Sequence, residues 1–503
     1  YLDDVAFQTW VTRRAHPDWT VHPYLMLVDR TTPTDVDGLH QLFRIVERDG
    51  RVDVELTATP TAERLGRPIL VALDVAREVD TIIAGGGRDP DADPRNARPM
   101  DERATAYADL WRTGRRDPVD LGPKCKSCEF RTDPAQPDDD RRSGFDQCWG
   151  ENLGHRHDPD EPHVFAIWNP RRTANWLARG IHRMRDVPLD ELDERQRLQA
   201  TMATGRLTSD ELVRDELADE LAAWEYPLHF VDFETVAPAI PFHAGLRPYQ
   251  SLAFQFSCHH LDADGTITHD QWLATDAGVY PNHEFLVRLR ESLGDRGTVL
   301  RYGAHENTIL RHLADQLRDG VRPAPADLDT DALLDWIASL TTGGDRAMVD
   351  MLALVRRHYY HRRMGGSNSI KAVLPAVLQA GRELERLYAR PLAFGTSLVG
   401  RTLWQRDPDT GRVRDPYELL PPLFDDVDLD LDRLAALDVD ERLKDGGAAM
   451  VAWSRMQSCA MGDDQRRAIA DGLLRYCELD TLAMVMIHQH WVARLRDGRD
   501  GWE

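Results

Sequence analysis

Residues 230–235, with the sequence FVDFET, restrict the folding of this chain more than any other segment. Apolar residues flank Asp232 and Glu234, which are one residue apart, and this pattern favours a strand. On a strand both acids leave the same face, so they could share a divalent cation. Two solvated acids on an edge strand are the alternative, but the flanking Phe and Val residues indicate burial. The segment therefore predicts a metal site.

Length and composition fit a soluble protein of more than one domain. The 503 residues are enough for two or three domains, and 42% hydrophobic and 29% charged residues are ordinary values. No apolar run approaches the roughly 20 residues that span a bilayer, and residues 1–4 do not resemble a signal peptide. We expect a cytoplasmic protein. Because the chain begins without Met inside an expected helix, residues 3–14, we also expect that an N-terminal part is missing.

The net charge of −23 argues against a protein that coats nucleic acid, because counterion release needs clustered Lys and Arg. It does not exclude a local groove. Nearly all the positive charge is Arg, which suits bidentate phosphate contacts, although a genome rich in G and C also favours Arg codons.

Three cysteines lie in a region of weak hydrophobic content. Cys125 and Cys128 form a C-x2-C pair, and Cys148 follows after an Asp/Pro/Arg-rich stretch that cannot supply a core. In a reducing compartment this pattern favours a metal or iron–sulfur site over disulfides. Three thiolates are one ligand short of the usual four, and a ligand upstream of residue 1 is the simplest source of the fourth.

The second half alternates expected strands and helices. Three antiparallel strands followed by α/β alternation predict a mixed sheet flanked by helices. Residues 174–224 look helical and charged, and we interpret them as a helical linker between the halves, with Glu211 to Val213 inside it. Residues 407–464 are acidic and weakly periodic, which indicates an insertion or cap. The expected strands are 229–235, 252–261, 266–273 and 298–302, and the expected helices include 282–293 and 307–317.

Acidic and tyrosine side chains from distant segments could join Asp232 and Glu234. Glu306 lies where an expected strand ends and a helix begins, and Asp350 starts a later helix, where a capping role explains it. Tyr476 and Asp480 are four residues apart, so they share one face of the last helix. Two divalent cations need several carboxylates, and a tyrosine near the attacking water can orient or deprotonate it. This set meets the requirement for phosphodiester hydrolysis.

The order of these motifs resembles the DEDD exonuclease superfamily, tyrosine subtype, which has an RNase H-like fold. Longer stretches are similar to the bacterial domain of unknown function 2779. In that family an RNase H-like domain follows a RecB-type PD-(D/E)XK nuclease region with an iron–sulfur cysteine set. The stretches that carry this second resemblance are residues 226–227 (YP), 248–250 (PYQ), 254–257 (FQFS), 365–371 (GGSNSIK) and 476–485 (YCELDTLAMV).

The resemblance assigns roles in the C-terminal domain, residues 225–503. It implies a site for two Mg²⁺ or Mn²⁺ ions, with Tyr476 positioning the water. Glu306 stands where the superfamily has Asp, and a histidine subtype would carry its His at the position of Arg475. The implied metal ligands are Asp232, Glu234, Glu306 and Asp480.

For residues 1–173 the resemblance implies a partial RecB-like α/β region. Gln8 would be the helix residue that supports the nuclease site, and the catalytic Asp, Glu and Lys would lie upstream. Cys125, Cys128 and Cys148 would be three of the four ligands of a 4Fe-4S cluster, with the fourth Cys upstream of this chain.

Several other polar residues have more than one interpretation. Lys371 and Ser367 could contact a phosphate, but a Gly-rich turn that caps a helix explains them equally well. We interpret His259, His260 and His305 as structural.

The expected function is a two-metal 3′–5′ exonuclease acting on single-stranded DNA or RNA. A non-catalytic module that binds nucleic acid or supports assembly is the main alternative, and the charge of −23 and the Glu at position 306 favour it. In a third interpretation the main nuclease activity belongs to an upstream domain, and this half guides the strand.

Overall fold

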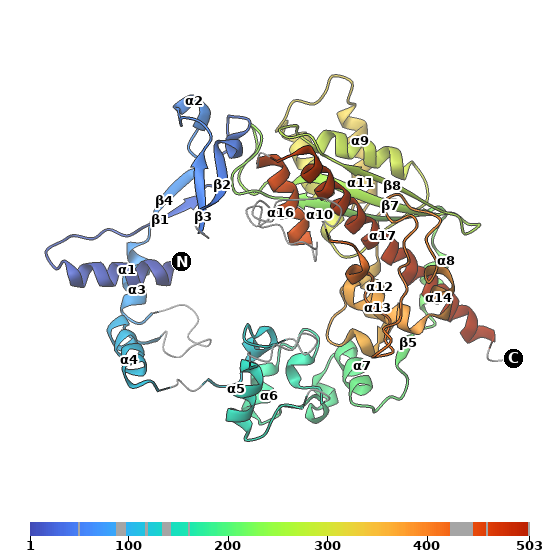
Figure 1. Cartoon of the computed structure of the whole chain (residues 1–503), viewed down its shortest axis with the longest axis horizontal. Coiled ribbons are helices and arrows are strands. Elements are labelled where there is room, and N and C mark those ends of the chain that lie inside the picture. Colours follow the sequence, from blue (N-terminus) through green and yellow to red (C-terminus); the bar gives the residue numbers. More distant parts are fainter. Residues whose placement is uncertain are drawn as a thin grey trace.

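The computed structural model describes eight stretches of the chain. They are residues 1–48, 51–86, 97–115, 119–132, 142–158, 161–422, 446–458 and 461–500. No helix in these stretches combines the length and apolar character that a bilayer crossing requires. In Figure 1 the colours follow the chain from the N-terminal elements (blue), through α5 (Gly144–Leu153) and α6 (Thr173–Ala178), to the C-terminal half that ends in α17 (Asp463–Asp500, red).

Within the described residues, five strands of the C-terminal half form one mixed sheet in the order β10-β9-β6-β7-β8. β6 pairs antiparallel with β7, and β7 pairs antiparallel with β8. β9 runs parallel to β6, and β10 runs parallel to β9. The predicted mixed α/β architecture is therefore confirmed. The strands are β6 Leu228–Val236, β7 Leu252–Leu261, β8 Ile267–Leu273, β9 Thr298–Arg301 and β10 Val349–Asp350.

Both faces of the sheet are covered by helices (Figure 1). Val231 and Phe233 of β6 pack against α9 (Asn282–Leu293), α10 (His305–Arg318) and α11 (Thr330–Leu340). Phe230 of β6 packs on the opposite face. Because side chains alternate along a strand, Asp232 and Glu234 lie on the same face as Phe230. The helices that cover this face are α12 Met351–His358, α13 Ile370–Ala380 and α17 Asp463–Asp500.

Helix α17 crosses the face of the sheet that carries the acidic residues. Its middle is apolar on all sides, and Leu479 and the run from Leu482 to Ile487 are fully buried, as expected for a helix in the interior of a protein. This burial fixes how α17 lies on the sheet, and it directs Tyr476 and Asp480 toward β6.

The expected helical linker is wrong at Glu211, Leu212 and Val213. These residues form strand β5 (Glu211–Val213), which pairs antiparallel with β11 (Tyr359–His361). Leu212 and Val213 pack against the core on the α17 side of the sheet. The neighbouring residues are helical, in α7 (Glu194–Ala203) and α8 (Leu217–Ala222). Tertiary packing therefore outweighs the helix-like local pattern here.

The N-terminal region has its own small core. Val79 and Ile82 of α3 (Ala76–Ile83) pack against Ala6 of α1 (Leu2–Ala15), beside Met100 of α4 (Met100–Thr113). β1 (Tyr24–Val28) pairs antiparallel with β4 (Leu70–Asp74), and β2 (Phe43–Arg48) with β3 (Arg51–Leu56).

The loop after β1 contacts the C-terminal half. The Thr34 amide donates to the carbonyl of Leu246 over 2.9 Å, and the Gly245 amide donates back to Thr34 over 2.8 Å. Asp37 accepts a hydrogen bond from Arg322 over 2.9 Å.

Only part of the expected insertion at residues 407–464 is described. It includes η8 (Pro416–Leu419) and α16 (Gly446–Ser458), while residues 423–445 and 459–460 lie outside the described residues. Trp453 of α16 stacks on Phe254 of β7 with ring centroids 4.6 Å apart. Helix α16 therefore packs directly against the sheet.

A buried histidine joins three elements of the C-terminal half. His490 of α17 contacts Glu211 of β5 over 2.6 Å and Glu383 of α14 (Arg382–Tyr388) over 2.7 Å. Burial alone would lower the pKa of His490, but the hydrogen bonds to the two carboxylates outweigh it and raise the pKa above 6.5. Burial would raise the pKa of each carboxyl, whereas the hydrogen bond from His490 lowers both pKa values below 4.5.

Replacing His490 by Gln should destabilise the protein by on the order of 3 kcal/mol near pH 5.5, where all three groups are charged. The raised pKa means that His490 contributes fully below 6.5 and loses its contribution as the pH rises through its folded-state pKa. The loss of thermal stability should therefore be smaller at pH 9, as measured by denaturation of both proteins at the two pH values.

His488, two residues away on the same helix, supplies the matched control. Burial lowers its pKa to about 4, so it folds uncharged and opposes folding below 6.5. H488Q should therefore cost less stability at pH 5.5 than at pH 9, the reverse trend. Equal losses for H490Q at both pH values would contradict a charged His490.

Candidate metal centre

Three of the predicted metal ligands meet between β6 and α17. Carboxylate oxygens of Asp232, Glu234 and Asp480 all lie within 4.8 Å of one another. Glu234 and Asp480 are buried, and Asp232 is partly exposed. β6 supplies the first two from one face, and α17 supplies the third from the helix packed on that face. The cluster therefore depends on this helix–sheet contact.

Glu306 borders the same space from a different direction. It lies in the first turn of α10, is 2% exposed, and lines a cavity of about 340 Å³ together with Asp232, Glu234 and Asp480. Among the described residues, its Oε2 atom has no hydrogen-bond partner. The structure thus brings all four predicted carboxylates to one cavity.

Burial and mutual repulsion act on these carboxyl groups. The pKa of Asp232 is raised well above 3.8, first by burial and then by the charges of Asp480, Glu234 and Glu306. Burial raises the pKa of Glu306 to about 8, against a backbone hydrogen bond and the charge of Arg301. Burial also raises the pKa of Asp480 to about 6, although Tyr417 and Lys371 act in the opposite direction. A cation among these groups would relieve the repulsion.

Tyr476 lines the cavity one turn before Asp480, and it is 3% exposed. Its ring lies 5.9 Å from the ring of Tyr417, which belongs to η8. The Lys371 ammonium lies 5.1 Å from the centre of the Tyr476 ring and 5.0 Å from that of Tyr417. The Tyr417 hydroxyl donates a hydrogen bond to Asp480.

Asp350 has the capping role that its sequence position suggests. It accepts hydrogen bonds from the amides of Leu352 and Ala353 at the start of α12. It also accepts from the Gly303 amide over 3.0 Å and pairs with Arg301 over 3.3 Å. Asp350 thereby fixes the turn between β9 and α10, and that turn positions Glu306.

Sequence reasoning missed two contributors to this site and left a third open. Tyr417 lies in the weakly periodic acidic segment, where nothing in the local pattern indicates its contact with Asp480. His305, which we interpreted as structural, lines the cavity and contacts the Thr235 hydroxyl over 3.2 Å. Lys371, for which a phosphate contact and a turn role were both open, also lines the cavity.

The predicted residues of the first half lie away from this cavity. Gln8 is exposed on α1, and its amide donates to Asp4 over 3.2 Å. Cys125 of η3 (Pro123–Ser127), Cys128 and Cys148 of α5 (Gly144–Leu153) are partly buried free thiols. Burial raises the pKa of Cys125, while the hydrogen bond from the Gly122 amide acts in the opposite direction. The iron–sulfur cluster stays a prediction.

One comparison with known proteins gives a match. Residues 229–369 match the family model of a domain of unknown function, DUF2779. This result supports the family inferred above. The matched segment contains Asp232, Glu234 and Glu306 but ends before Tyr476 and Asp480. A search of curated proteins and a search of solved structures each gave no match.

Replacing Asp232 by Asn should stabilise the metal-free protein by roughly 1–2 kcal/mol, because it removes one of the like charges that repel one another in the cluster. The variant should also lose the thermal stabilisation that Mg²⁺ or Mn²⁺ gives the unmodified chain. Thermal denaturation in EDTA and in Mn²⁺ measures both effects. Asp335→Asn, at an exposed position of α11, is the control and should change neither. Equal stabilisation of D232N and the unmodified chain by Mn²⁺ would contradict a metal centre here.

Proposed function

We propose that this chain is a metal-dependent nuclease, most simply a 3′–5′ exonuclease that acts on single-stranded DNA or RNA. The observation that carries the proposal is the set of carboxylates from β6, α10 and α17 that borders one cavity with a tyrosine and a lysine. Side chains drawn from distant parts of the chain converge there, as two-metal hydrolysis of a phosphodiester requires.

The donor set fits hard divalent cations. Asp232, Glu234, Glu306 and Asp480 offer carboxylate oxygens alone, which suit Mg²⁺ and Mn²⁺ better than softer metals. The Oε2 atom of buried Glu306 has no hydrogen-bond partner among the described residues, so it could be a ligand to a cation. When bound, such ions supply stabilisation of the negative charge that develops on the attacking and leaving oxygens.

The other side chains at the cavity have roles suited to this reaction. Lys371 brings a positive charge to a cavity that also contains the four acids, and it can attract a phosphate. Tyr476 lies one helical turn from Asp480, where its hydroxyl can orient the attacking water. Tyr417 holds Asp480 through a hydrogen bond, which limits the orientations of that carboxylate.

The topology supports an RNase H-like assignment of the C-terminal half. Three antiparallel strands are followed by two strands parallel to the first, with the first strand at the centre of the described sheet. The acidic pair lies on that central strand. This position agrees with the order of motifs expected for a DEDD exonuclease.

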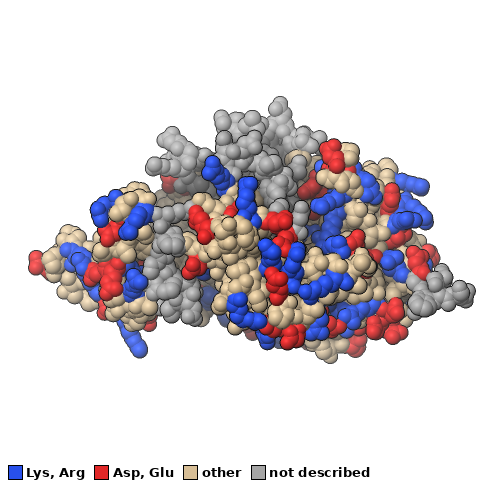
Figure 2. Space-filling model, turned by 90° about the horizontal axis from the view of Figure 1, so that it is seen from below, with Lys and Arg blue, Asp and Glu red and all other residues tan. Residues whose placement is uncertain are grey.

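The surface charges favour a local binding groove over bulk attraction of nucleic acid. On the face in Figure 2, Lys and Arg side chains are interspersed with Asp and Glu. With a net charge of −23, a strand would be held through local contacts such as Lys371 near the acidic cavity.

The direct test is degradation of labelled single-stranded DNA and RNA oligonucleotides in Mg²⁺ or Mn²⁺. We expect mononucleotides to be released from the 3′ end, EDTA to stop the reaction, and D232N to lower the rate by at least about 100-fold. D335N should retain full activity. Degradation by D232N at the unmodified rate would refute the proposal, and metal-independent binding without products would favour the non-catalytic alternative.

Replacing Tyr476 by Phe should lower kcat by about 100-fold, because the group that orients the water is lost while the carboxylates remain. The stabilisation by Mn²⁺ and the KM should change little. Tyr388→Phe is the matched control, since this buried tyrosine bonds to Gln489 through its hydroxyl and does not line the cavity. If Y476F kept full kcat, Tyr476 would have no role in the chemistry.

A further inference from the structure

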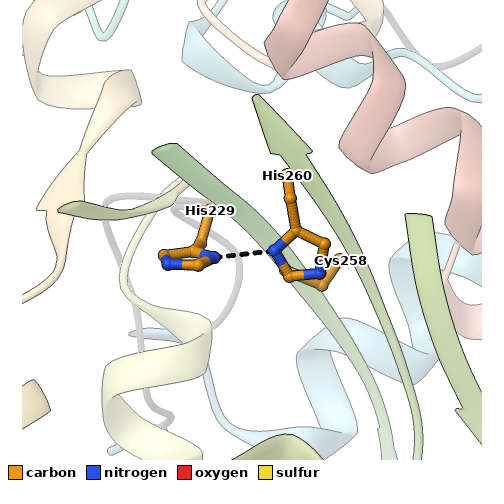
Figure 3. Close-up of side chains that lie close together, drawn as sticks. All are labelled: His229, Cys258 and His260. Atoms are coloured by element: carbon orange, nitrogen blue, oxygen red, sulfur yellow. Dashed lines mark hydrogen bonds between the residues drawn. The ribbon is translucent and has the colours of Figure 1, made fainter. Parts of the chain in front are cut away.

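A second group of potential metal ligands lies on the opposite face of the same strand. His229 of β6 is paired across the sheet with His260 of β7, and Val231 is paired with Cys258. His229, Cys258 and His260 therefore share the face that carries Val231, away from Asp232. Their ligand atoms lie within 4.8 Å of one another (Figure 3), and the two Nδ1 atoms are 2.7 Å apart.

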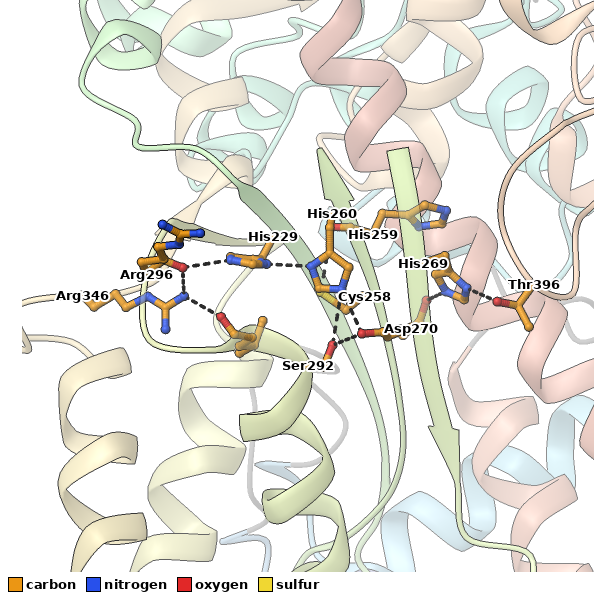
Figure 4. Close-up of polar contacts among 12 residues, drawn as sticks. His229, Cys258, His259, His260, His269, Asp270, Ser292, Arg296, Arg346 and Thr396 are labelled. Carbon is orange, nitrogen blue, oxygen red and sulfur yellow. Dashed lines mark hydrogen bonds and ion pairs between the residues drawn. The ribbon is translucent and has the colours of Figure 1, made fainter. Parts of the chain in front are cut away.

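The outer nitrogen of His229 is held by a backbone carbonyl. His229 Nε2 lies 3.0 Å from the carbonyl oxygen of Arg296, which can only accept, so the Nε2–H donates. A neutral imidazole then has its lone pair on Nδ1. Arg346 donates to the carbonyls of Gly294 over 2.6 Å and Gly297 over 2.9 Å, and it also bonds to that of Arg296 (Figure 4). This loop is thereby fixed around the imidazole.

The outer nitrogen of His260 faces a carboxylate. His260 Nε2 lies 3.3 Å from Asp270 Oδ2, and the Ser292 hydroxyl donates to the same oxygen over 3.1 Å (Figure 4). Because the carboxylate accepts and the serine hydrogen is already engaged, His260 Nε2 is a donor. Its Nδ1 therefore also carries a lone pair when the ring is neutral.

The lone pairs on Nδ1 of His229 and Nδ1 of His260 thus point toward each other beside the thiol of Cys258. Cys258 Sγ lies 3.7 Å from His260 Nδ1, and Cys258 is fully buried. Facing lone pairs 2.7 Å apart repel each other unless one nitrogen carries a proton, or unless the two rings move apart slightly and bind one metal ion. Histidines that bind metals almost always donate their other N–H to a backbone carbonyl or a carboxylate, and this pair shows one of each.

We propose that His229, Cys258 and His260 bind one zinc-class divalent cation. Two imidazole nitrogens and one thiolate suit Zn²⁺, unlike the oxygen-only set of the first site. Three protein ligands leave a fourth position, and the partial exposure of His260 provides access from solvent. The ion would tie β6 to β7 three residues before Asp232. This inference goes beyond the proposed nuclease activity, and it revises our interpretation of His260 as structural.

A neighbouring cluster shows the contrast. His259, His269 and Glu478 are also close together, on the face toward α17. However, hydroxyl groups already bind these imidazoles: Thr481 bonds to His259 Nδ1 over 2.8 Å, and Ser257 bonds to His269 Nε2 over 2.8 Å. One nitrogen of each imidazole is therefore already engaged by a hydroxyl, while His259 Nε2 has no hydrogen-bond partner among the described residues. His259 serves as the matched control for His260, because it lies on the other face of β7.

The test measures Co²⁺ binding to the full chain after removal of metals, by metal analysis and by the absorption of thiolate-bound cobalt. Cys125, Cys128 and Cys148 can also bind Co²⁺, so the readout is the difference between variants. C258S and H260Q should each lose one equivalent of Co²⁺, and C258S should lose the absorption of one thiolate. H259Q should retain both, and circular dichroism checks that each variant is folded.

Asp270→Asn extends the test to a residue whose loss leaves the core unchanged, because its side chain is 58% exposed. D270N should weaken Co²⁺ binding at this site by about 10- to 100-fold, since the charged acceptor for the second nitrogen of a ligating histidine is replaced by a neutral amide. Identical cobalt content and spectra in the unmodified chain, C258S, H260Q and D270N would overturn the proposal. A proton shared by the two imidazoles would then account for their contact.

Discussion

Carboxylates of like charge face one another across the contact between β6 and α17, and the rest of the C-terminal half holds them there. Asp232 and Asp480 repel each other in a buried space, so the contact has to be stabilised by other groups. The fully buried run of α17 from Leu482 to Ile487 supplies that stabilisation by packing against Phe230 and its neighbours. The apolar core thus sustains an arrangement that the acids alone would oppose.

The pleat of β6 separates two kinds of chemistry. Because side chains alternate, residues 230, 232 and 234 face α17, while 229, 231 and 233 face α9. A shift of one residue in the register of β6 would turn the carboxylates of Asp232 and Glu234 toward α9 and the imidazole of His229 toward α17. The register with β7 is continuous through Asp232, and an irregularity follows between Glu234 and Thr235. The exchange is prevented by apolar packing on both faces.

Much of the sheet is predictable from sequence because its strands are apolar and its turns are well marked. The expected strand 252–261 is β7, and the expected helix 282–293 is α9. The strand at Glu211 to Val213 is not predictable in this way, since its partner β11 lies more than a hundred residues away and its neighbours are helical. Asp232 and Glu234 could be identified because alternate residues of a strand share a face, and Tyr476 with Asp480 because residues four apart share a helix face. Tyr417 could not, because only the folded chain brings η8 to Asp480.

The candidate site is built from residues inside and outside the segment that matches the family model. The matched residues 229–369 include most of β6, the turn before α10 and three of the carboxylates. They do not include α17, whose side chains line the other side of the cavity. α17 brings Asp480 and Tyr476, and η8 brings the hydroxyl that orients Asp480. Glu306 enters from the first turn of α10, which Asp350 fixes through the Gly303 amide. Its carboxylate lines the same cavity as the other three acids, so the Glu that stands where an Asp was expected still borders the candidate site.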